Sequence, residues 1–172
     1  TTQSSILNLG QDRTGDGYSY IDLIGDATYS DYGLRIIRNN TGANTTSAIQ
    51  HRGTGEFNLK ATEAAPITFG TTNTEKMRIA ADGNVGIGTT NPAHELDVQA
   101  TTDPSIRVRS TGTGTSDDAL IRLQTAGSTT ASNYIFFGDS VDADAGWIRY
   151  RHSEDSMQFR VNAAERMRIA ST

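Results

Sequence analysis

The stretch from Glu75 to Val98 reads EKMRIAADGNVGIGTTNPAHELDV and carries the clearest structural signals of the chain. Apolar residues alternate with other residues in EKMRIA and in NVGIG, which is the pattern of half-buried β-strands. Asp82-Gly83 lies between these two runs and favours a two-residue type I′ turn, because this dipeptide tolerates positive φ angles. The sequence therefore predicts a tight hairpin, and Pro92 should end the segment because proline has no N–H to donate.

Two glycines alternate with two β-branched residues in the second strand of this hairpin. Val85 and Ile87 make one face of the strand apolar, while Gly86 and Gly88 leave the other face bare. A glycine inside a strand is destabilising unless something uses the vacated space. We therefore expect the two β-branched side chains to be buried, and another strand or chain to approach the two glycines closely.

The composition favours an all-β fold. Apolar residues make up 35% of the 172 residues, against about 45–50% in typical globular domains. The net charge of −5 is small and the apolar residues are patterned, which argues against disorder. Thr suits a half-exposed pleated surface and Gly suits tight turns. Burial of so few apolar residues compensates poorly for the conformational entropy that the chain loses on folding. We therefore expect other chains to complete the core.

Several kinds of partner are excluded by the same composition. The chain has no cysteine, so no disulfide holds the fold together. No apolar run approaches the length of a membrane span, and no signal peptide opens the sequence. The mild acidity argues against a general nucleic-acid binder. The sequence therefore predicts no membrane insertion, no nucleic-acid partner and no cofactor.

Short strand patterns recur along the whole chain, separated by turn residues. No window shows a sustained 3.6-residue apolar period with capping residues, so we expect almost no helix. Besides the hairpin, the expected strands are Ser5–Gly10, Tyr18–Gly25, Tyr32–Asn39, Ser47–Gly53, Gly55–Ala61, Pro66–Thr71, His94–Val98, Pro104–Ser110, Ala119–Thr125, Asn133–Ser140, Gly146–Arg151, Met157–Ala163 and Glu165–Ala170.

The second half of the chain resembles the first. ALIRLQT places Ile121 at an offset of 100 from Ile21, and ERMRIA follows EKMRIA at an offset of 90, Glu165 against Glu75. MQFRVNA resembles EFNLKA, and the drifting offset indicates an insertion near NYIFFGDS and a deletion of the PITFGT segment. Loops tolerate such changes better than strands do.

These patterns predict two diverged antiparallel β-repeat units, residues 1–80 and 104–172. A hairpin connector over residues 81–103, containing the GNVGIGTTNP motif, should join them. The sequence ends where the partner strand of ERMRIA is expected. We therefore expect the second unit to be truncated before its own connector, and the chain to be a piece of a longer polypeptide.

Residues Met77–Val98, MRIAADGNVGIGTTNPAHELDV, resemble a signature of bacteriophage tail-fibre and related virion appendage proteins, and a second copy begins at Met167. The carriers of this resemblance are Asp82, Gly83, Val85, Gly86, Ile87, Gly88 and Pro92. Members of this family often end in a self-cleaving chaperone domain, which is absent from these 172 residues, so its chemistry is not carried over.

The resemblance implies an elongated parallel homotrimer in an extracellular, particle-bound position. It implies other virion tail proteins as partners, and a host cell-surface glycan or protein as a further partner. Near a threefold axis, bare glycine backbone would let three chains lie close together.

Residues that could carry catalysis or bind a metal have structural interpretations that we favour. Asp139, Asp142 and Asp144 could supply oxygens to Ca²⁺, but an acidic solvated loop is the commoner arrangement. The run DRTGDGYSYID lacks the glutamate that a calcium loop needs at its last position. The chain has three histidines, His51, His94 and His152, which are isolated from one another in the sequence. GIGTTN and GTGTSD lack the lysine and spacing of a phosphate-binding loop.

The arginines and the aromatic residues can each be interpreted in two ways. Thirteen Arg stand against two Lys, and many Arg alternate with apolar residues. These Arg could form a solvated outer face or pair with acids of another subunit. The aromatic residues Tyr134, Phe136, Phe137 and Trp147 fit a core or an interface better than a sugar-binding platform.

Two classes of function are compatible with these patterns. The first is a non-enzymatic structural segment of a phage tail fibre that supports attachment to the host surface. The second is a tailspike-like glycan-degrading enzyme, which needs opposed carboxylates across a groove. The short loops argue against the second class. A non-viral secreted β-repeat adhesin shares the fold of the first.

Overall fold

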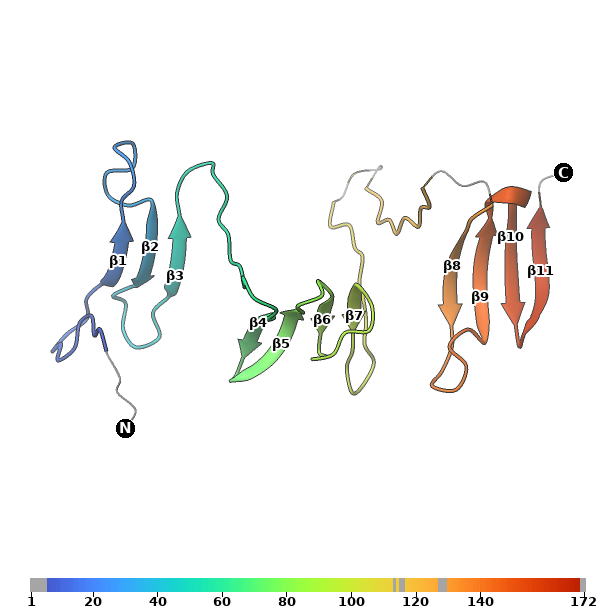
Figure 1. Cartoon of the computed structure of the whole chain (residues 1–172), viewed down its shortest axis with the longest axis horizontal. Helices are drawn as coiled ribbons and strands as arrows, with labels where there is room; N and C mark the ends of the chain where they lie inside the picture. Colours follow the sequence, from blue (N-terminus) through green and yellow to red (C-terminus); the bar gives the residue numbers. More distant parts are fainter. Residues whose placement is uncertain (1–5, 113, 115–116, 127–129, 171–172) are drawn as a thin grey trace. The chain divides into compact units, whose positions relative to one another are not determined.

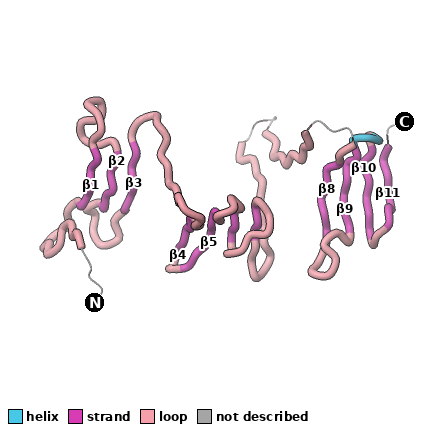
Figure 2. Tube along the Cα trace, viewed as in Figure 1, coloured by secondary structure: helices cyan, strands magenta, loops and turns pink. Residues whose placement is uncertain are grey.

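The computed structural model describes residues 6–112, 114, 117–126 and 130–170. Two units are distinguished within the chain, Thr1–Thr101 and Thr102–Thr172. Regular structure in the described part is almost entirely strand (Figure 2), so the predicted all-β class is confirmed. The one helix among the described residues is η1, a 3-10 turn over His152–Glu154, and no helix there is long and apolar enough to cross a membrane.

Eleven strands form three sheets within the described residues (Figure 1). The strand orders are β1-β2-β3, β4-β5-β6-β7 and β8-β9-β10-β11. Consecutive strands are therefore neighbours throughout, as expected for short connections. The strands are β1 (Ser19–Leu23), β2 (Leu34–Arg38), β3 (Ser47–His51), β4 (Ile67–Thr71), β5 (Thr74–Ile79), β6 (Val85–Ile87), β7 (Leu96–Val98), β8 (Ser132–Phe137), β9 (Gly146–Arg151), β10 (Ser156–Val161) and β11 (Ala164–Ala170).

The first and third sheets are antiparallel throughout, whereas the second is mixed. β6 pairs antiparallel with β5 on one side and parallel with β7 on the other. Both β6 and β7 lie within residues 81–103, so this segment completes the second sheet. Since Pro92 lies between β6 and β7, outside both strands, its missing N–H interrupts no ladder.

The turn at Asp82-Gly83 differs from the two-residue type I′ turn that we expected. Ala80 N–H donates to the carbonyl of Asn84 at 2.8 Å, so the loop contains three residues. Gly83 has a φ of +95°, while Asp82 is not among the residues with positive φ. A three-residue loop with glycine in the left-handed region is the next commonest hairpin connection. The side chain of Asp82 instead accepts a hydrogen bond from the backbone N–H of Asn84 at 3.1 Å.

Two hairpins share the same construction, β4–β5 in the second sheet and β10–β11 in the third. Thr72 and Asn73 connect the first pair with φ angles of 51° and 57°, and Asn162 and Ala163 connect the second with 50° and 58°. Positive φ at both positions is the mark of a type I′ turn. Each hairpin has its register shift just before the turn, between Phe69 and Gly70 or between Phe159 and Arg160.

EKMRIA and ERMRIA are 90 residues apart in the sequence. Because the two hairpins are alike, the same offset of 90 also relates their turns and the strands before those turns, β4 and β10. MQFRV therefore corresponds to ITFGT, not to EFNLK as we expected, and the PITFGT segment has a counterpart in the second half. The reason is that Gly55–Ala61 forms no strand, whereas Ser156–Val161 does.

Four expected strands are not formed by the described residues. Residues 6–10, 55–61, 104–110 and 119–125 lie outside every sheet; Ser5, which begins the first of these stretches, lies outside the described part. All four carry the alternating pattern, but that pattern creates a strand only where a neighbouring strand completes the ladder.

The described residues bury very little. Ile37 is the one buried hydrophobic residue among them, at 9% exposure, and Ser156 and Gln158 are the buried polar residues. Large apolar side chains in all three sheets remain exposed, for example Leu23 at 58% and Ile169 at 59%. A sheet with one face packed against a core would hide such side chains, so each sheet here has an apolar face that this single chain leaves uncovered.

Candidate functional site

The most distinctive surface of each sheet is its apolar face, which the strand registers define. Residues directly opposite each other in neighbouring strands share a face, and residues two apart in a strand share it too. The apolar face of the first sheet carries Ile21, Leu23, Leu34, Ile36 and Ile49. That of the second carries Ile67, Phe69, Met77, Ile79, Val85, Ile87, Leu96 and Val98. That of the third carries Ile135, Phe137, Ile148, Met157, Phe159, Val161, Met167 and Ile169.

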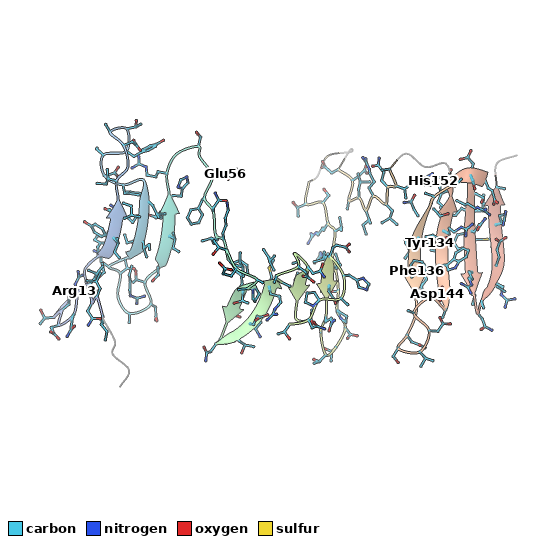
Figure 3. All side chains as sticks on the ribbon, viewed as in Figure 1. Arg13, Glu56, Tyr134, Phe136, Asp144 and His152 are labelled. Carbon is cyan, nitrogen blue, oxygen red and sulfur yellow. The ribbon has the colours of Figure 1, made fainter. Side chains whose placement is uncertain are left out.

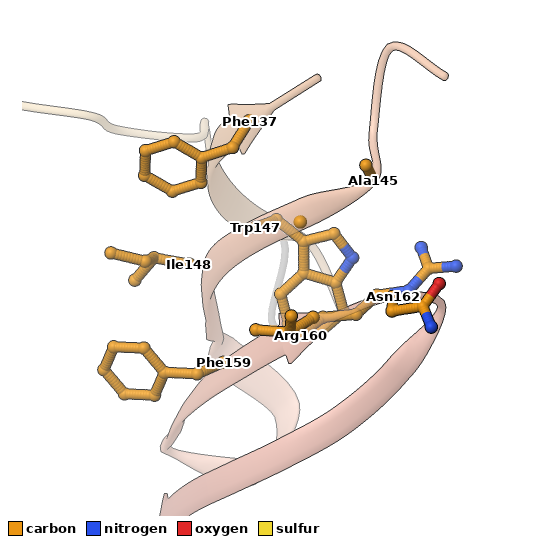
Figure 4. A pocket seen from close by; sticks show the side chains of 9 residues that line it. Phe137, Ala145, Trp147, Ile148, Phe159, Arg160 and Asn162 are labelled. Carbon is orange, nitrogen blue, oxygen red and sulfur yellow. The ribbon is translucent and has the colours of Figure 1, made fainter. Parts of the chain in front are cut away.

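The apolar face of the third sheet is hollowed into a groove of about 540 Å³. Phe137, Ile148 and Phe159 project to the same side of the sheet from three neighbouring strands, as Figure 4 shows. Trp147 and Arg160 point to the other side in the same view. The groove is open and almost entirely apolar, which is the character of a surface that another protein surface covers.

Two irregular segments lie against these faces. Ile121 and Leu123 line a groove of about 330 Å³ together with Ile135, Ile148 and Met157 of the third sheet. Residues 59–63 and Ala65 line another with Ile67 and Ile79 of the second sheet. These segments cover the faces only in part, since Ile135 of the third sheet remains 48% exposed and Ile121 itself is 76% exposed.

The opposite face of the first sheet is organised around an arginine. Arg35 binds Asp22 with two parallel hydrogen bonds of 2.6 and 2.7 Å. Its guanidinium group also lies 4.0 Å from the ring centre of Tyr32 and 4.7 Å from that of Tyr20. The hydrogen bond from Arg35 lowers the pKa of the Asp22 carboxyl below its usual value. Arginine suits this position because its planar group can stack and pair at once.

The opposite face of the third sheet repeats this arrangement with other aromatics. Tyr134 and Phe136 lie side by side on β8, and their rings stack at 5.0 Å (Figure 3). Arg149 lies 5.7 Å from the ring centre of Tyr134 and 5.4 Å from that of Trp147. Its Nε is buried and has no hydrogen-bond partner among the described residues. Because that donor is covered, Arg149 supports the aromatic face more than it offers a ligand site.

Both bulged hairpins carry an ion pair between residues three apart. Arg78 donates to Glu75 at 2.6 and 2.9 Å, and Arg168 donates to Glu165 at 2.9 and 2.8 Å. The hydrogen bond from the arginine lowers the pKa of each glutamate. Both glutamates belong to the same chain as their arginines. Arg78 and Arg168 therefore have acidic partners without another subunit.

A polar cluster that includes two buried side chains lies at the η1 end of the third sheet. Glu154 Oε2 accepts hydrogen bonds from Gln158 at 3.2 Å and Arg168 at 2.9 Å, and Arg151 pairs with Oε1 at 2.5 Å. Gln158 is 1% exposed and Ser156 is fully buried. The pattern of the sequence did not indicate this cluster, because Glu154 lies in a turn and meets its partners only when three strands come together.

The glycine motif is approached closely by its own chain. A Cβ on Gly86 would lie 2.7 Å from the carbonyl oxygen of Thr89, and a Cβ on Gly88 would collide with the carbonyl of Gln99. Gly86 is buried, whereas Ile87 is 41% exposed and Val85 is half-buried. The two β-branched side chains therefore belong to the uncovered apolar face of the second sheet, and our expectation of burial is wrong for Ile87 in the single chain.

The acidic loop between β8 and β9 is ordered by its own carboxylates. Asp139 accepts hydrogen bonds from the backbone N–H groups of Val141 at 2.8 Å and Asp142 at 3.0 Å. These two hydrogen bonds lower the pKa of the Asp139 carboxyl, and the one from the Asp142 N–H has the larger effect. Asp144 pairs with Arg160 at 3.5 Å. Throughout the described residues, no group of three or more His, Asp or Glu side chains is placed to hold a metal ion.

Two of the three histidines have local partners. His51 stacks on Phe57 with ring centres 5.8 Å apart, and its Nε2 lies 3.1 Å from the carbonyl oxygen of Gly55. His152 Nε2 lies 2.6 Å from the side-chain oxygen of Asn133. Each of these two histidines is therefore held by a neighbour in its own chain.

The sequence matches no protein-family model, and no curated protein is similar to it. The resemblance of Met77–Val98 to virion appendage proteins therefore rests on those residues alone.

Proposed function

We propose that this chain is a non-enzymatic structural segment of a phage tail fibre, a virion appendage, and that it works as a homotrimer. Its three apolar faces would form the shared core, and its arginine-bearing faces would meet the solvent. The observation that carries this proposal is the near absence of a private core, with Ile37 as the one buried hydrophobic residue among those described.

The exposed area supports self-association. The chain exposes 14105 Å², while a monomeric globular protein of 18.5 kDa exposes about 8,200 Å². The difference is about 5,900 Å², and obligate interfaces bury about 2,000–5,000 Å² or more. Extended loops account for part of this difference, and the apolar faces account for a part that only another protein surface would cover.

A second copy is the partner that fits these faces. The faces are dominated by apolar residues, with Arg38 as a charged residue on that of the first sheet, so they resemble the centre of an obligate interface rather than that of a transient one. Closed cyclic assemblies place the same surface of each copy around one axis. Three copies, each contributing the apolar face of the same sheet, would enclose an apolar core at that sheet. The number three comes from the resemblance of Met77–Val98 to trimeric appendage proteins.

The role on a virion is supported by the MRI…GNVGIGTT.P stretch. The non-enzymatic role is supported by polar groups that are engaged in structure: Asp139 orders its loop and Glu154 holds three strands together. The proposed partners are other tail proteins and a surface molecule of the host, outside the cell.

Sedimentation equilibrium of the purified chain tests the assembly, with an expected mass of three chains. Two neighbouring residues of β8 make a matched pair: Ile135 lies on the apolar face at 48% exposure and Phe136 on the opposite face at 54%. Ile135→Asp should abolish the trimer because it places a charge in the shared core. Phe136→Asp should retain it.

A compact and stable monomer at low concentration would refute the assembly. Release of reducing sugar from host envelope glycans would refute the non-enzymatic role. Antibodies against the chain should label appendages of virus particles in electron micrographs, and labelling confined to other structures would refute the virion location.

A further inference from the structure

We infer that Ala119–Thr125 of one copy pairs as a β-strand with the free edge of β8 in a neighbouring copy. The inference rests on the self-association proposed above and is independent of any role on a virion. It names a strand that passes from one copy to the next, and therefore an interface made by backbone hydrogen bonds as well as by apolar faces.

The first observation is an extended segment that lacks a ladder. ALIRLQT has the alternating pattern of a strand, yet it belongs to no sheet. Within the described residues, none of its backbone groups bonds to another backbone group. Leu120 is 69% exposed, Ile121 76% and Leu123 48%. Strand-forming residues with free backbone groups require a partner strand, because unpaired N–H and C=O groups become costly once the side chains are covered.

The second observation is an unprotected sheet edge. The third sheet ends in β8 on one side and β11 on the other. Natural proteins protect exposed edges with charged residues. β11 follows this rule with Glu165, Arg166 and Arg168, whereas SNYIFF of β8 carries no charge at all. An uncharged aromatic edge of six residues is a site where another strand adds.

The third observation is that the segment does not occupy this edge in its own copy. Ile121 and Leu123 share a groove with Ile135, Ile148 and Met157, which belong to three different strands. The segment therefore rests across the apolar face of its own sheet, and its backbone is left available to a neighbour. With apolar faces turned toward a common interior, side chains resting on one sheet lie near the edge of the next.

The two partners also match in side-chain chemistry. Adding the segment to β8 with Ile121 and Leu123 on the apolar side extends the row that Ile135 and Ile148 begin. Arg122 then falls on the other side, beside Tyr134 and Phe136. Arg149 already lies over the ring of Tyr134 in this way, so a second arginine at that position is a favourable cation–π partner.

Single cysteines in separate copies test the pairing, and the chain offers a clean background because it has none of its own. One copy, lengthened by a tag, carries Arg122→Cys. The other carries Tyr134→Cys or Phe136→Cys, which covers two registers. The two copies are unfolded together, refolded and oxidised. We expect a disulfide-linked pair of unequal chains on a non-reducing gel, with a decrease of both single-chain bands, because each trimer that contains both variants can link two of its three chains.

The matched control is Arg166→Cys on β11, the charged edge, which should leave the single-chain bands in place. A double variant with Arg122→Cys and Tyr134→Cys in one chain should link between copies; a link within one chain would overturn the inference. Sedimentation of the same samples separates the two proposals. A trimer without interchain links refutes the strand pairing alone, whereas absence of association refutes the self-association as well.

Discussion

Arg35 binds both carboxylate oxygens of Asp22 across the β1–β2 pair, with Nε 2.6 Å from Oδ1 and Nη2 2.7 Å from Oδ2. The two side chains are only 21% and 17% exposed. The arginine is held on its other faces by Tyr20 and Tyr32. This pair joins two strands on the face of the sheet that also carries the buried Ile37, and it makes the stability of the first sheet depend on pH.

Asp22→Asn should weaken the first sheet and flatten its acid dependence. The folded chain lowers the pKa of Asp22 below its ordinary value of 3.8. A lowered carboxyl pKa contributes stability that is present above the ordinary value and is lost as the pH falls through the folded value. Urea unfolding of the unmodified chain should therefore need less denaturant below about pH 4. The variant should already be weaker at neutral pH and should change less on acidification.

Asp31→Asn is the matched control for this experiment. Asp31 pairs with Arg52 at 2.5 Å, but it is 59% exposed. Exposed pairs contribute little to stability. An equal effect of the two substitutions would contradict the special role of the Asp22–Arg35 pair.

Ala163→Gly should stabilise the β10–β11 hairpin. Ala163 has a φ of 58°, which is unfavourable for a residue with a Cβ and natural for glycine. Relief of this strain should raise the free energy of unfolding by about 1 kcal/mol. Ala164→Gly, one residue later in β11, should instead lower it by about 0.5–1 kcal/mol. Chemical denaturation at one protein concentration measures both, and a loss of stability in Ala163→Gly would count against the type I′ turn.

Gly86→Ala should destabilise the second sheet. The new Cβ would lie 2.7 Å from the Thr89 carbonyl oxygen and 3.2 Å from Thr89 Cγ2, so the strand or the following turn must move. Overpacking of this kind costs about 1–3 kcal/mol. Gly55→Ala is the matched control, because nothing lies within 4 Å of its added Cβ. Thermal melting of both variants decides the matter: identical melting temperatures would show that Gly86 is not closely approached.

Gln158→Ala should destabilise the third sheet. Gln158 is 1% exposed, and its side chain donates to Ser156 at 3.0 Å and to Glu154 at 3.2 Å. Its removal leaves buried polar partners short of a hydrogen bond, at a cost of about 1–3 kcal/mol. Gln50→Ala on the exposed surface of β3 should change stability by no more than about 0.5 kcal/mol. Tryptophan fluorescence during urea unfolding would report the effect, because Trp147 lies in the same sheet.

In residues 75–87 the strands could be predicted from the sequence, whereas the turn could not. Alternation in EKMRIA and NVGIG placed β5 and β6 correctly, because the two-residue period is a property of one strand. The turn type was missed: Asp82-Gly83 forms a three-residue loop, while the type I′ turns lie at Thr72-Asn73 and Asn162-Ala163. Turn type depends on which residues of the two strands face each other, so dipeptide preference alone could not decide it.

The sequence by itself determined the all-β class, the near absence of helix and the position of most strands, since these follow from local alternation and turn residues. The tertiary structure decided which alternating segments become strands. Ala119–Thr125 alternates as clearly as Ser19–Leu23, yet only the latter has a neighbour in its own chain. It also decided that Glu154, Gln158 and Arg168 meet. Ladders and polar clusters join residues far apart in sequence, and their free energy depends on that joining rather than on either segment alone.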